Sequence, residues 1–435
     1  MRINNKKNIR DLFIGLDEKV CNSKGHCIEG INFDNAATTP PIKSCIDCIY
    51  RLGSNYASIG RGTGQKAQIT TDLYHASKEF IMDFFKVREK DRYVVVYVNN
   101  TTEGINKLAK TLVKENDDEV VISSRMEHHS NDLPWRKRGK VDYIEVDEKG
   151  RLKIEELENK LKNNCGKVKY VSLTGASNVT GYVNDIHYIA KIVHKYDAKL
   201  IVDAAQLVPH KKVEISGETE SEDIDFLVFS SHKIYSPFGV GVIIGLKEEF
   251  EKADPDYAGG GTVDLVLDNK EIYLPPPERD EAGTPNFLGV MSLINSLSFI
   301  NTIGYDYIEE HEKILLEHVL NGLKSIPGII NYGDIENIDD RLGIATFNIG
   351  KMYHRDVAEI LAKKNGISVR HGWFCAHPYC RRLMNVSEKE AGLFLESPGE
   401  KMMGMIRISF AIYNSLDEVD TFLNVIENIC KDNPK

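Results

Sequence analysis

The feature that most constrains the fold of this 435-residue chain is a regular alternation of apolar strands with helical segments. Runs rich in Val, Ile and Leu occur at 92–98, 118–123, 168–173, 198–204 and 224–230, and segments with helical spacing lie between many of them. Such strands are buried on both faces, which is typical of a mainly parallel sheet covered by helices on both sides. The sequence therefore predicts an α/β fold whose ligands bind beyond the carboxyl ends of the strands.

The pattern changes after residue 290, where two long helices at 290–304 and 305–324 precede a mixed portion of helices and strands. A chain of this length is long enough for two hydrophobic cores. We expect an N-terminal segment at 1–30 that packs with the smaller domain, a large cofactor-binding domain at 31–290, and a smaller α+β domain at 291–435.

Composition and charge limit the kinds of partner. The chain has 55 basic and 65 acidic residues, a formal net charge of −10, which argues against a general nucleic-acid or anionic membrane surface. The first residues lack the apolar core of a signal peptide, and no stretch approaches the roughly 20 apolar residues of a membrane span. We expect a soluble cytoplasmic protein that binds neither nucleic acid nor membrane.

The eight cysteines are scattered, which fits an intracellular protein better than a disulfide framework. Cys45 and Cys48 have the spacing of a zinc-binding pair, and Cys21 and Cys27 lie upstream with a wider spacing. A four-thiolate zinc site is the alternative here. We expect no metal ion, with Cys45 and Cys48 one turn apart on a helix.

Two ionisable residues stand near the ends of consecutive predicted strands. Asp203 lies at the end of the strand at 198–204, and Lys233 follows the strand at 224–230. Both side chains are therefore expected at one edge of the sheet. A buried lysine is costly unless it is paired or used, and one use is as a Schiff-base amine beside a carboxylate that holds the pyridinium nitrogen of pyridoxal 5′-phosphate (PLP). A simple Asp203–Lys233 salt bridge is the alternative.

Two further strand ends carry residues suited to that cofactor. Thr101 and Thr102 lie at a strand-to-helix junction, where hydroxyls and free backbone N–H groups suit a phosphate, although the same residues are ordinary helix caps. His128 and His129 follow the strand at 118–123, where an imidazole can stack on a pyridine ring or lie in a surface loop. These weak signals at successive strand ends favour a PLP site more strongly together than singly, and the alternatives stay open.

Nine short segments, in this order, carry a family resemblance: "FDNAATTP", "NNTTEGIN", "MEHHSNDLPW", "SNVTG", "VDAAQLVPH", "FSSHKIYSPFGVG", "GGGT", "EAGTPN" and "RISFAIYN". Together they resemble the class V, PLP fold-type I enzymes, and specifically the SUF-type cysteine desulfurases and selenocysteine lyases. The resemblance covers about residues 31–425, nearly the whole chain.

The resemblance implies roles around the cofactor. Lys233 would bind PLP covalently, and Asp203 would pair with the pyridinium nitrogen. His128 would stack on the ring and take part in catalysis, and Gln206 would bond the phenolic oxygen. The phosphate would be held by Thr101, Thr102, Ser230 and His232, together with Thr284 from a second subunit of a homodimer.

The resemblance also implies roles around the substrate, an amino acid such as L-cysteine. Asn178 and Arg407 would bind its carboxylate, Arg370 would help to orient it, and Ala36 would contact it.

The stretch "VRHGWFCAHPY" at 369–379 holds Cys375. Desulfurases of this group carry Arg-x-Gly-His-His-Cys-Ala-x-Pro here, so Cys375 falls on the nucleophile that receives sulfur as a persulfide. A cysteine packed in a tight turn is the alternative. Trp373 and Phe374 replace the usual histidine pair, and Gly60 stands where many relatives place a phosphate-contacting histidine.

The sequence thus predicts a PLP-dependent cysteine desulfurase that forms L-alanine and passes sulfur to Cys375, from which an acceptor protein would collect it. Two alternatives stay open. One is another class V enzyme, such as a selenocysteine lyase, C–S lyase, aminotransferase or epimerase. The other is a non-catalytic scaffold with the same fold.

Overall fold

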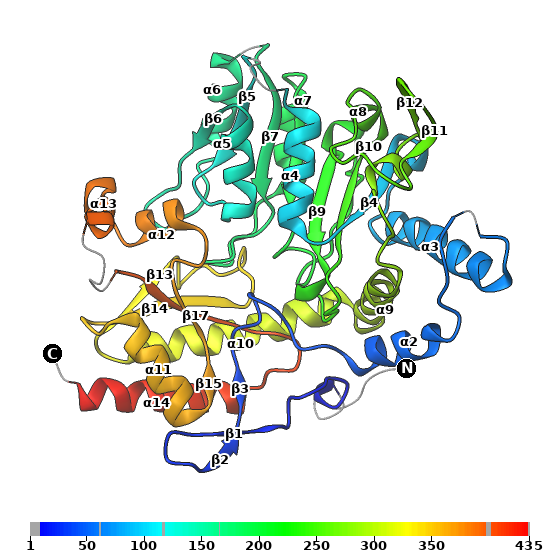
Figure 1. Cartoon of the computed structure of the whole chain (residues 1–435). Helices are drawn as coiled ribbons and strands as arrows, with labels where there is room; N and C mark the ends of the chain where they lie inside the picture. Colours follow the sequence, from blue (N-terminus) through cyan, green and yellow to red (C-terminus); the bar gives the residue numbers. More distant parts are fainter. Residues whose placement is uncertain (1–8, 61, 115–117, 165, 397–401, 434–435) are drawn as a thin grey trace.

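The computed structural model describes residues 9–60, 62–114, 118–164, 166–396 and 402–433. A seven-stranded sheet forms the centre of the larger part of the molecule (Figure 1). Its strands lie in the order β4 (Tyr93–Val98), β10 (Gly241–Leu246), β9 (Phe226–Ser230), β8 (Lys199–Asp203), β7 (Val168–Thr174), β5 (Val120–Ser124) and β6 (Lys140–Ile144). The five strands from β9 to β6 are parallel, and β10 runs antiparallel to both neighbours. The predicted mainly parallel α/β sheet is confirmed.

Helices pack on this sheet and extend from its edges. Helix α4 (Thr101–Leu112) contacts β9 and β10, α7 (Ile186–His194) contacts β8, and α3 (Gln65–Phe84) contacts β4. The other helices of this part are α2 (Lys43–Gly53), α5 (Leu133–Arg138), α6 (Glu155–Asn163), α8 (Lys247–Glu251) and α9 (Phe287–Ile303). A hairpin of β11 (Val263–Leu267) and β12 (Lys270–Tyr273) extends from the same side as α8 (Figure 1).

The smaller part is built on a four-stranded antiparallel sheet of β13 (Ile329–Tyr332), β14 (Ile344–Ile349), β17 (Met405–Ser409) and β16 (Arg370–Gly372). Its helices are α10 (Tyr305–Ser325), α11 (His354–Asn365), α12 (His377–Leu383), α13 (Glu388–Glu396) and α14 (Leu416–Asp432). The N-terminal region adds a hairpin of β1 (Lys19–Cys21) and β2 (Cys27–Glu29), and β3 (Ile31–Asn32) pairs in parallel with β15 (Ile367–Ser368).

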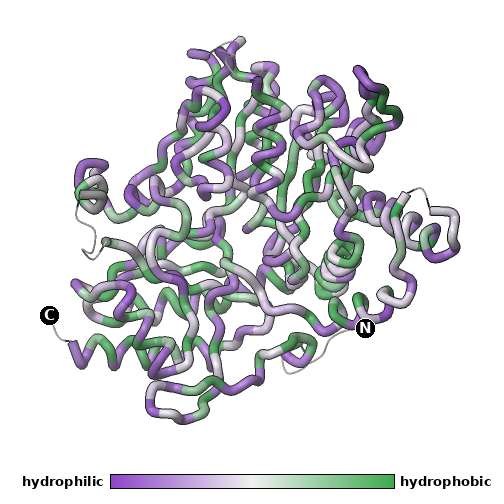
Figure 2. Tube along the Cα trace, in the orientation of Figure 1, coloured by the Kyte–Doolittle hydropathy of each residue, from purple (hydrophilic) through white to green (hydrophobic). Residues whose placement is uncertain are grey.

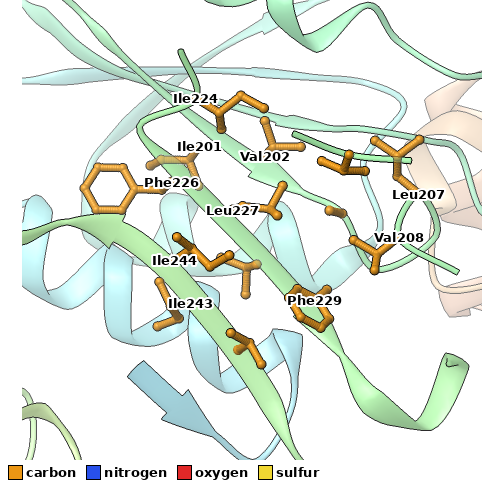
Figure 3. Close-up of a cluster of buried hydrophobic side chains, with 14 of the residues drawn as sticks. Ile201, Val202, Leu207, Val208, Ile224, Phe226, Leu227, Phe229, Ile243 and Ile244 are labelled. Atoms are coloured by element: carbon orange, nitrogen blue, oxygen red, sulfur yellow. The ribbon is translucent and has the colours of Figure 1, made fainter. Parts of the chain in front are cut away.

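The large core is built from the continuous apolar strands. Ile201, Phe226, Leu227 and Ile244 are among its fully buried members (Figure 3). Figure 2 shows hydrophobic segments along the central strands and hydrophilic segments at the outer turns. A second core lies in the smaller part. Because β7, β8 and β9 are parallel neighbours, their carboxyl ends meet at one edge, which faces the smaller part.

The packing corrects the predicted start of the smaller domain at residue 291. Leu293, Leu297 and Ile300 of α9 pack in the large core, because this helix is apolar around its circumference and lies against α2 and α3. Helix α10 then joins the two cores, with Ile308 in the first and Leu315 in the second. The change of core therefore falls inside α10.

The N-terminal segment also differs from the prediction that residues 1–30 pack with the smaller domain; residues 1–8 lie outside the described residues. Phe13 packs in the large core, with its ring centroid 5.1 Å from that of Tyr235. The hairpin of β1 and β2 does lie against the smaller part, where Ser23 N–H donates to Lys363 O at 2.6 Å. The segment therefore contacts both parts of the molecule.

The four cysteines considered for a zinc site lie in two different parts of the structure. Cys45 and Cys48 lie on α2, as predicted, whereas Cys21 and Cys27 are exposed on the hairpin of β1 and β2. Among the described residues, no group of three or more His, Cys, Asp or Glu side chains is arranged to hold a metal ion.

No single helix in the described part of the chain is long and apolar enough to cross a membrane; α9 and α10 reach that length and composition only as a pair bent by 77°.

Candidate active site

A cavity of about 530 Å³ lies at the carboxyl ends of β7, β8 and β9, between the two cores. This volume is in the range of small-molecule and cofactor sites. The structure brings together here nearly all the residues that the sequence singled out: Ala36, Thr101, Thr102, His128, Asn178, Asp203, Gln206, Ser230, His232, Lys233, Arg370, Cys375 and Arg407. Thr284 is exposed and lies outside this cavity.

Lys233 and Asp203 both line the cavity, Asp203 at the end of β8 and Lys233 just after the end of β9, and their charges interact. Burial lowers the pKa of Lys233 to about 8, and the nearby Asp203 carboxylate opposes that shift. Burial likewise raises the pKa of Asp203, although a hydrogen bond from Ala205 N–H at 3.0 Å and the nearby Lys233 favour the ionised form. The result is an amine that loses its proton far more easily than an ordinary lysine.

The side-chain oxygen of Gln206 is available to bind a ligand. Its Nε2 donates to Ala36 O at 2.6 Å, which fixes the amide against the wall of the cavity. Within the described residues, Gln206 Oε1 is buried and has no hydrogen-bond partner. A buried amide oxygen without a hydrogen-bond donor is costly, so this position suits a bound group that donates a hydrogen bond.

His128 is held as a neutral imidazole. Its Nδ1 accepts a hydrogen bond from Ser130 N–H at 3.1 Å, which assigns the ring proton to Nε2. Burial lowers the pKa of His128 to about 3, and the charges of Lys233 and Arg407 add to that effect. A neutral, fixed ring of this kind is suited to stacking on an aromatic ligand.

The amino terminus of α4 forms another side of the cavity. Thr101 N–H donates to Ser230 Oγ at 2.7 Å, and the Thr102 and Ser130 hydroxyls are 2.7 Å apart. A Cβ at Gly241 would lie 2.6 Å from the carbonyl carbon of Asn100, so only glycine permits this close approach of β10 to the start of α4. Backbone N–H groups and the helix dipole favour an anion at this end.

His232 lies on the same side, where its Nδ1 is 3.2 Å from Thr38 Oγ1. Burial and the neighbouring Lys233 lower the pKa of His232 to about 4, so the ring is neutral near pH 7. It can therefore take part as a hydrogen-bonding group without adding charge.

Two arginines from the smaller part meet one carboxylate. Arg407 on β17 is buried, and its Nη2 lies 3.4 Å from Asp34 Oδ1. Arg370 on β16 contacts the same carboxylate, with Nη2 2.7 Å from Oδ2. Burial lowers the pKa of Arg407 to about 10, and Asp34 opposes the shift. In the described structure Arg407 Nε has no hydrogen-bond partner, which leaves a donor for an acidic ligand.

Asn178 connects Arg407 to the loop that holds the thiol. Its carbonyl oxygen accepts from Arg407 Nη1 at 2.7 Å, and its Nδ2 donates to Phe374 O at 2.8 Å. In the loop, Phe374 and Cys375 have φ angles of +49° and +53°. Two consecutive non-glycine residues in the left-handed region are strained, and the surrounding contacts hold them there.

His129 fixes the same loop from the other side. Its N–H donates to Cys375 O at 2.7 Å, and its Nε2 accepts from His377 N–H at 3.3 Å. The Cys375 side chain is exposed and lines the cavity. The thiol is thus presented to the cavity on an anchored turn rather than packed in a core.

Sequence reasoning missed several contributors to this arrangement. Asp34 was not singled out, and His129 and Phe374 were named but not as anchors of the Cys375 loop, because their partners lie far away in the chain. Glu127 was also missed; it precedes His128 in the chain and is buried, which raises its pKa to about 8, and Asn131 Nδ2 donates to it at 2.7 Å. Its only sequence signal is its place in "MEHHSND".

Comparison with known proteins identifies the family. The family model described as Aminotransferase class-V matches residues 31–422. The chain belongs to the aminotransferase class-V family. Among curated members of similar sequence, a "Probable cysteine desulfurase" of Pyrococcus abyssi is 34% identical and the match covers 93% of this chain and 95% of that protein. A "Cysteine desulfurase" of Wigglesworthia glossinidia brevipalpis is 32% identical over 98% and 97% of the two chains.

Solved cysteine desulfurase structures share the fold. The apo structure of a cysteine desulfurase from Thermococcus onnurineus NA1 matches with a TM-score of 0.81 and 31% identity, over 93% of this chain and 95% of that one. The cysteine desulfurase CsdA from Escherichia coli gives the same TM-score at 24% identity over 99% of both chains. The predicted class V resemblance and fold type are confirmed.

The cavity of this class-V chain fits the PLP that its family uses. A cofactor with a ring nitrogen, a phenolic oxygen, an aldehyde and a phosphate needs four complementary groups. Among the described residues, the buried Asp203 carboxylate suits the ring nitrogen, and the Gln206 amide suits the phenolic oxygen. The readily deprotonated Lys233 amine suits the aldehyde, and the amino terminus of α4 suits the phosphate. These groups are the residues that would hold PLP.

Proposed function

We propose that this class-V enzyme is a PLP-dependent cysteine desulfurase that converts L-cysteine to L-alanine and retains the sulfur on Cys375 as a persulfide. The observation that carries the proposal is the position of the Cys375 thiol, exposed in the same cavity that Lys233 and Arg407 line. A class-V enzyme that needs no protein nucleophile has no use for a thiol on an anchored, strained turn.

When bound, PLP supplies an electron sink that allows bonds at the substrate's Cα and Cβ to break. Lys233 is the residue that we assign to hold the cofactor and to move a proton at Cα. Its lowered pKa supports this role, because an amine with a pKa of about 8 is partly neutral near pH 7 and can accept a proton.

Arg407 is assigned to the substrate carboxylate. It is buried, its guanidinium is oriented by Asn178 O, and a planar guanidinium matches a carboxylate with two hydrogen bonds. Arg370 contributes a second positive charge from β16, and Asp34 holds both arginines.

Cys375 performs the step that makes the reaction a desulfuration. Its thiolate attacks the substrate sulfur, the bond between Sγ and Cβ of L-cysteine breaks, and a new S–S bond forms on Cys375. Cβ gains a proton in exchange, so one L-cysteine and one enzyme thiol become one L-alanine and one enzyme persulfide. No external oxidant or reductant is needed.

Three further parts of the proposal concern partners and location. We infer a homodimer in which Thr284 of one chain completes the phosphate site of the other, since Thr284 is exposed and outside its own cavity. We infer that a sulfur-acceptor protein collects the persulfide, since Cys375 is exposed. A cytoplasmic location is supported by the scattered cysteines.

The proposal is tested by incubating the PLP-loaded protein with L-cysteine, with L-selenocysteine, or with L-alanine and a keto acid, each under a reducing thiol, and with L-cystine in a separate reaction without the thiol. We expect alanine and sulfide from L-cysteine in equal amounts. A selenocysteine lyase would form alanine from L-selenocysteine alone, a C–S lyase would form pyruvate, and an aminotransferase would need a keto acid. Any of these results in place of alanine from L-cysteine would contradict the proposal.

A further inference from the structure

The hairpin of β1 and β2 carries two thiols opposite each other. Cys21 ends β1 and Cys27 begins β2, and the two are direct partners in the antiparallel register. Asn22 N–H donates to His26 O at 2.9 Å, which makes that pair the hydrogen-bonded one. Because the two kinds of pair alternate, Cys21 and Cys27 form a non-hydrogen-bonded pair, whose side chains approach more closely.

The Sγ atoms of Cys21 and Cys27 are 3.8 Å apart. The Cα atoms of a non-hydrogen-bonded pair are about 4.5 Å apart, which lies within the span that a disulfide bridges. Rotation of the two side chains is therefore enough to bring the sulfur atoms into bonding distance, and no movement of the backbone is needed.

The turn between the thiols is fixed, so their approach is a stable feature of the hairpin. The side chain of Asn22 accepts from Lys24 N–H and from His26 N–H, both at 3.0 Å. Gly25 has a φ of +78°, which suits glycine and completes the turn. Figure 1 shows the hairpin at the lower edge of the molecule, away from the large sheet.

These two thiols are also accessible, unlike others in the chain. Both Cys21 and Cys27 are exposed. By contrast Cys45 and Cys380 are buried, and their Sγ atoms donate to the carbonyl oxygens of Ser292 and Trp373 at 3.2 Å. Thiol–disulfide exchange requires access to the sulfur, so it is expected at the hairpin before it occurs at the buried positions.

We propose that Cys21 and Cys27 are a redox-modification site, which forms an intramolecular disulfide by exchange with low-molecular-weight disulfides. One thiolate attacks the external disulfide, forms a mixed disulfide and releases one thiol. The second hairpin thiol then attacks the mixed disulfide, closes the Cys21–Cys27 bond and releases a second thiol. The two hairpin thiols are oxidised, and one external disulfide is reduced to two thiols.

The hairpin site is independent of the proposed desulfuration, because neither thiol lines the cavity. Exchange proceeds through a thiolate, and the hydrogen bond with Cys21 raises the pKa of Cys27, so the reaction is expected to speed up as the pH rises. An exposed disulfide of this kind is labile and is returned to thiols by reductant.

The test uses the full chain and glutathione disulfide as the probe. Free thiols are then alkylated, and the protein is digested with trypsin without reduction. Cleavage after Lys24 separates Cys21, in the peptide 20–24, from Cys27, in the peptide 25–43. We expect mass spectrometry to find these two peptides joined, with alkylation of both cysteines reduced about tenfold and restored by dithiothreitol.

Two variants test whether the disulfide requires both hairpin cysteines. Cys27→Ser should remove the joined peptides and leave Cys21 as a stable mixed disulfide with glutathione. Cys430→Ser, which changes a cysteine outside the hairpin, should keep the joined peptides. Separate glutathione adducts on Cys21 and Cys27 in the unaltered chain, or full alkylation of both after oxidation, would overturn the proposal. Neither result depends on whether the protein releases alanine from L-cysteine.

Discussion

The guanidinium of Arg407 lies over the ring of Phe374, with Cζ 5.1 Å from the ring centroid. Phe374 stands where related desulfurases carry a histidine, and it precedes the proposed nucleophile Cys375. Its carbonyl is held by Asn178, which also binds Arg407. The proposed carboxylate-binding group and the proposed nucleophile loop are thus joined through one aromatic residue.

Replacing Phe374 by leucine should weaken substrate binding. The ring shields Arg407 from water and holds it by a cation–π contact worth about 0.5–2 kcal/mol. We expect Phe374→Leu to raise KM for L-cysteine about threefold to tenfold. The control is Phe80→Leu, which loses a stacked ring on α3 far from Arg407. An unchanged KM in Phe374→Leu would show that the aromatic contact does not support substrate binding.

Asp34 should act as a positioning residue for both arginines. Without its carboxylate, Arg407 and Arg370 repel each other and lose their shared partner. Hydrogen bonds to charged groups contribute about 1.5–3 kcal/mol, so we expect Asp34→Asn to raise KM for L-cysteine about tenfold or more. PLP content should stay normal.

The matched control for Asp34 is Asp17→Asn, which removes an exposed partner of Arg10 on the surface. It should leave KM unchanged. If Asp34→Asn instead lost PLP while KM in the remaining holoenzyme stayed normal, Asp34 would belong to the cofactor site and not to the carboxylate site.

Lys233 should determine the pH at which PLP attaches. Its folded pKa of about 8 lies below the ordinary lysine value of 10.5, so the neutral amine becomes abundant as pH rises through about 8. We expect the rate of PLP uptake by apoprotein, followed by absorbance, to increase across that pH range. Borohydride reduction followed by peptide mapping should place the pyridoxyl group on Lys233, and a group mapped to another lysine would contradict the assignment.

His128 should make the apoprotein less stable in acid. Its pKa falls from 6.5 in the unfolded chain to about 3 in the folded one, so the unfolded chain binds more protons between these values. The free energy of unfolding therefore rises with pH across that window and falls on acidification. We expect the loss between pH 7 and pH 5 to be about 2 kcal/mol smaller in His128→Gln than in the unaltered protein. Melting temperatures at both pH values measure it, and equal losses would count against a buried neutral imidazole.

Much of the fold could be predicted because most of its central strands are rich in buried apolar residues. The short runs that form β4, β7, β8 and β9 are rich in β-branched and other apolar residues, which favours buried strands. The strand ends then located Asp203 and Lys233 at one edge. The boundary between the two cores could not be predicted, because α9 is apolar all round and such a helix does not reveal which core it joins.

The finer geometry of the site depends on contacts between distant residues. Asp34 is one acidic residue in "FDNAATTP", and only the folded chain brings it to Arg370 and Arg407, 336 and 373 positions away. The positive φ angles of Phe374 and Cys375 likewise have no local sequence signal, because they are imposed by Asn178 and His129. Resemblance could assign a role to Cys375, but not the anchored turn that presents it.

The central claim is that Cys375 receives sulfur from L-cysteine. The most direct measurement follows protein persulfide and alanine together in a single turnover. It compares the unaltered protein with Cys375→Ala. Cys380→Ala is the matched control, since that thiol is buried. We predict one persulfide on Cys375 for each alanine formed in the unaltered protein. We also predict normal PLP content but no persulfide and no alanine in Cys375→Ala. Formation of alanine from L-cysteine at the normal rate by Cys375→Ala would contradict the account.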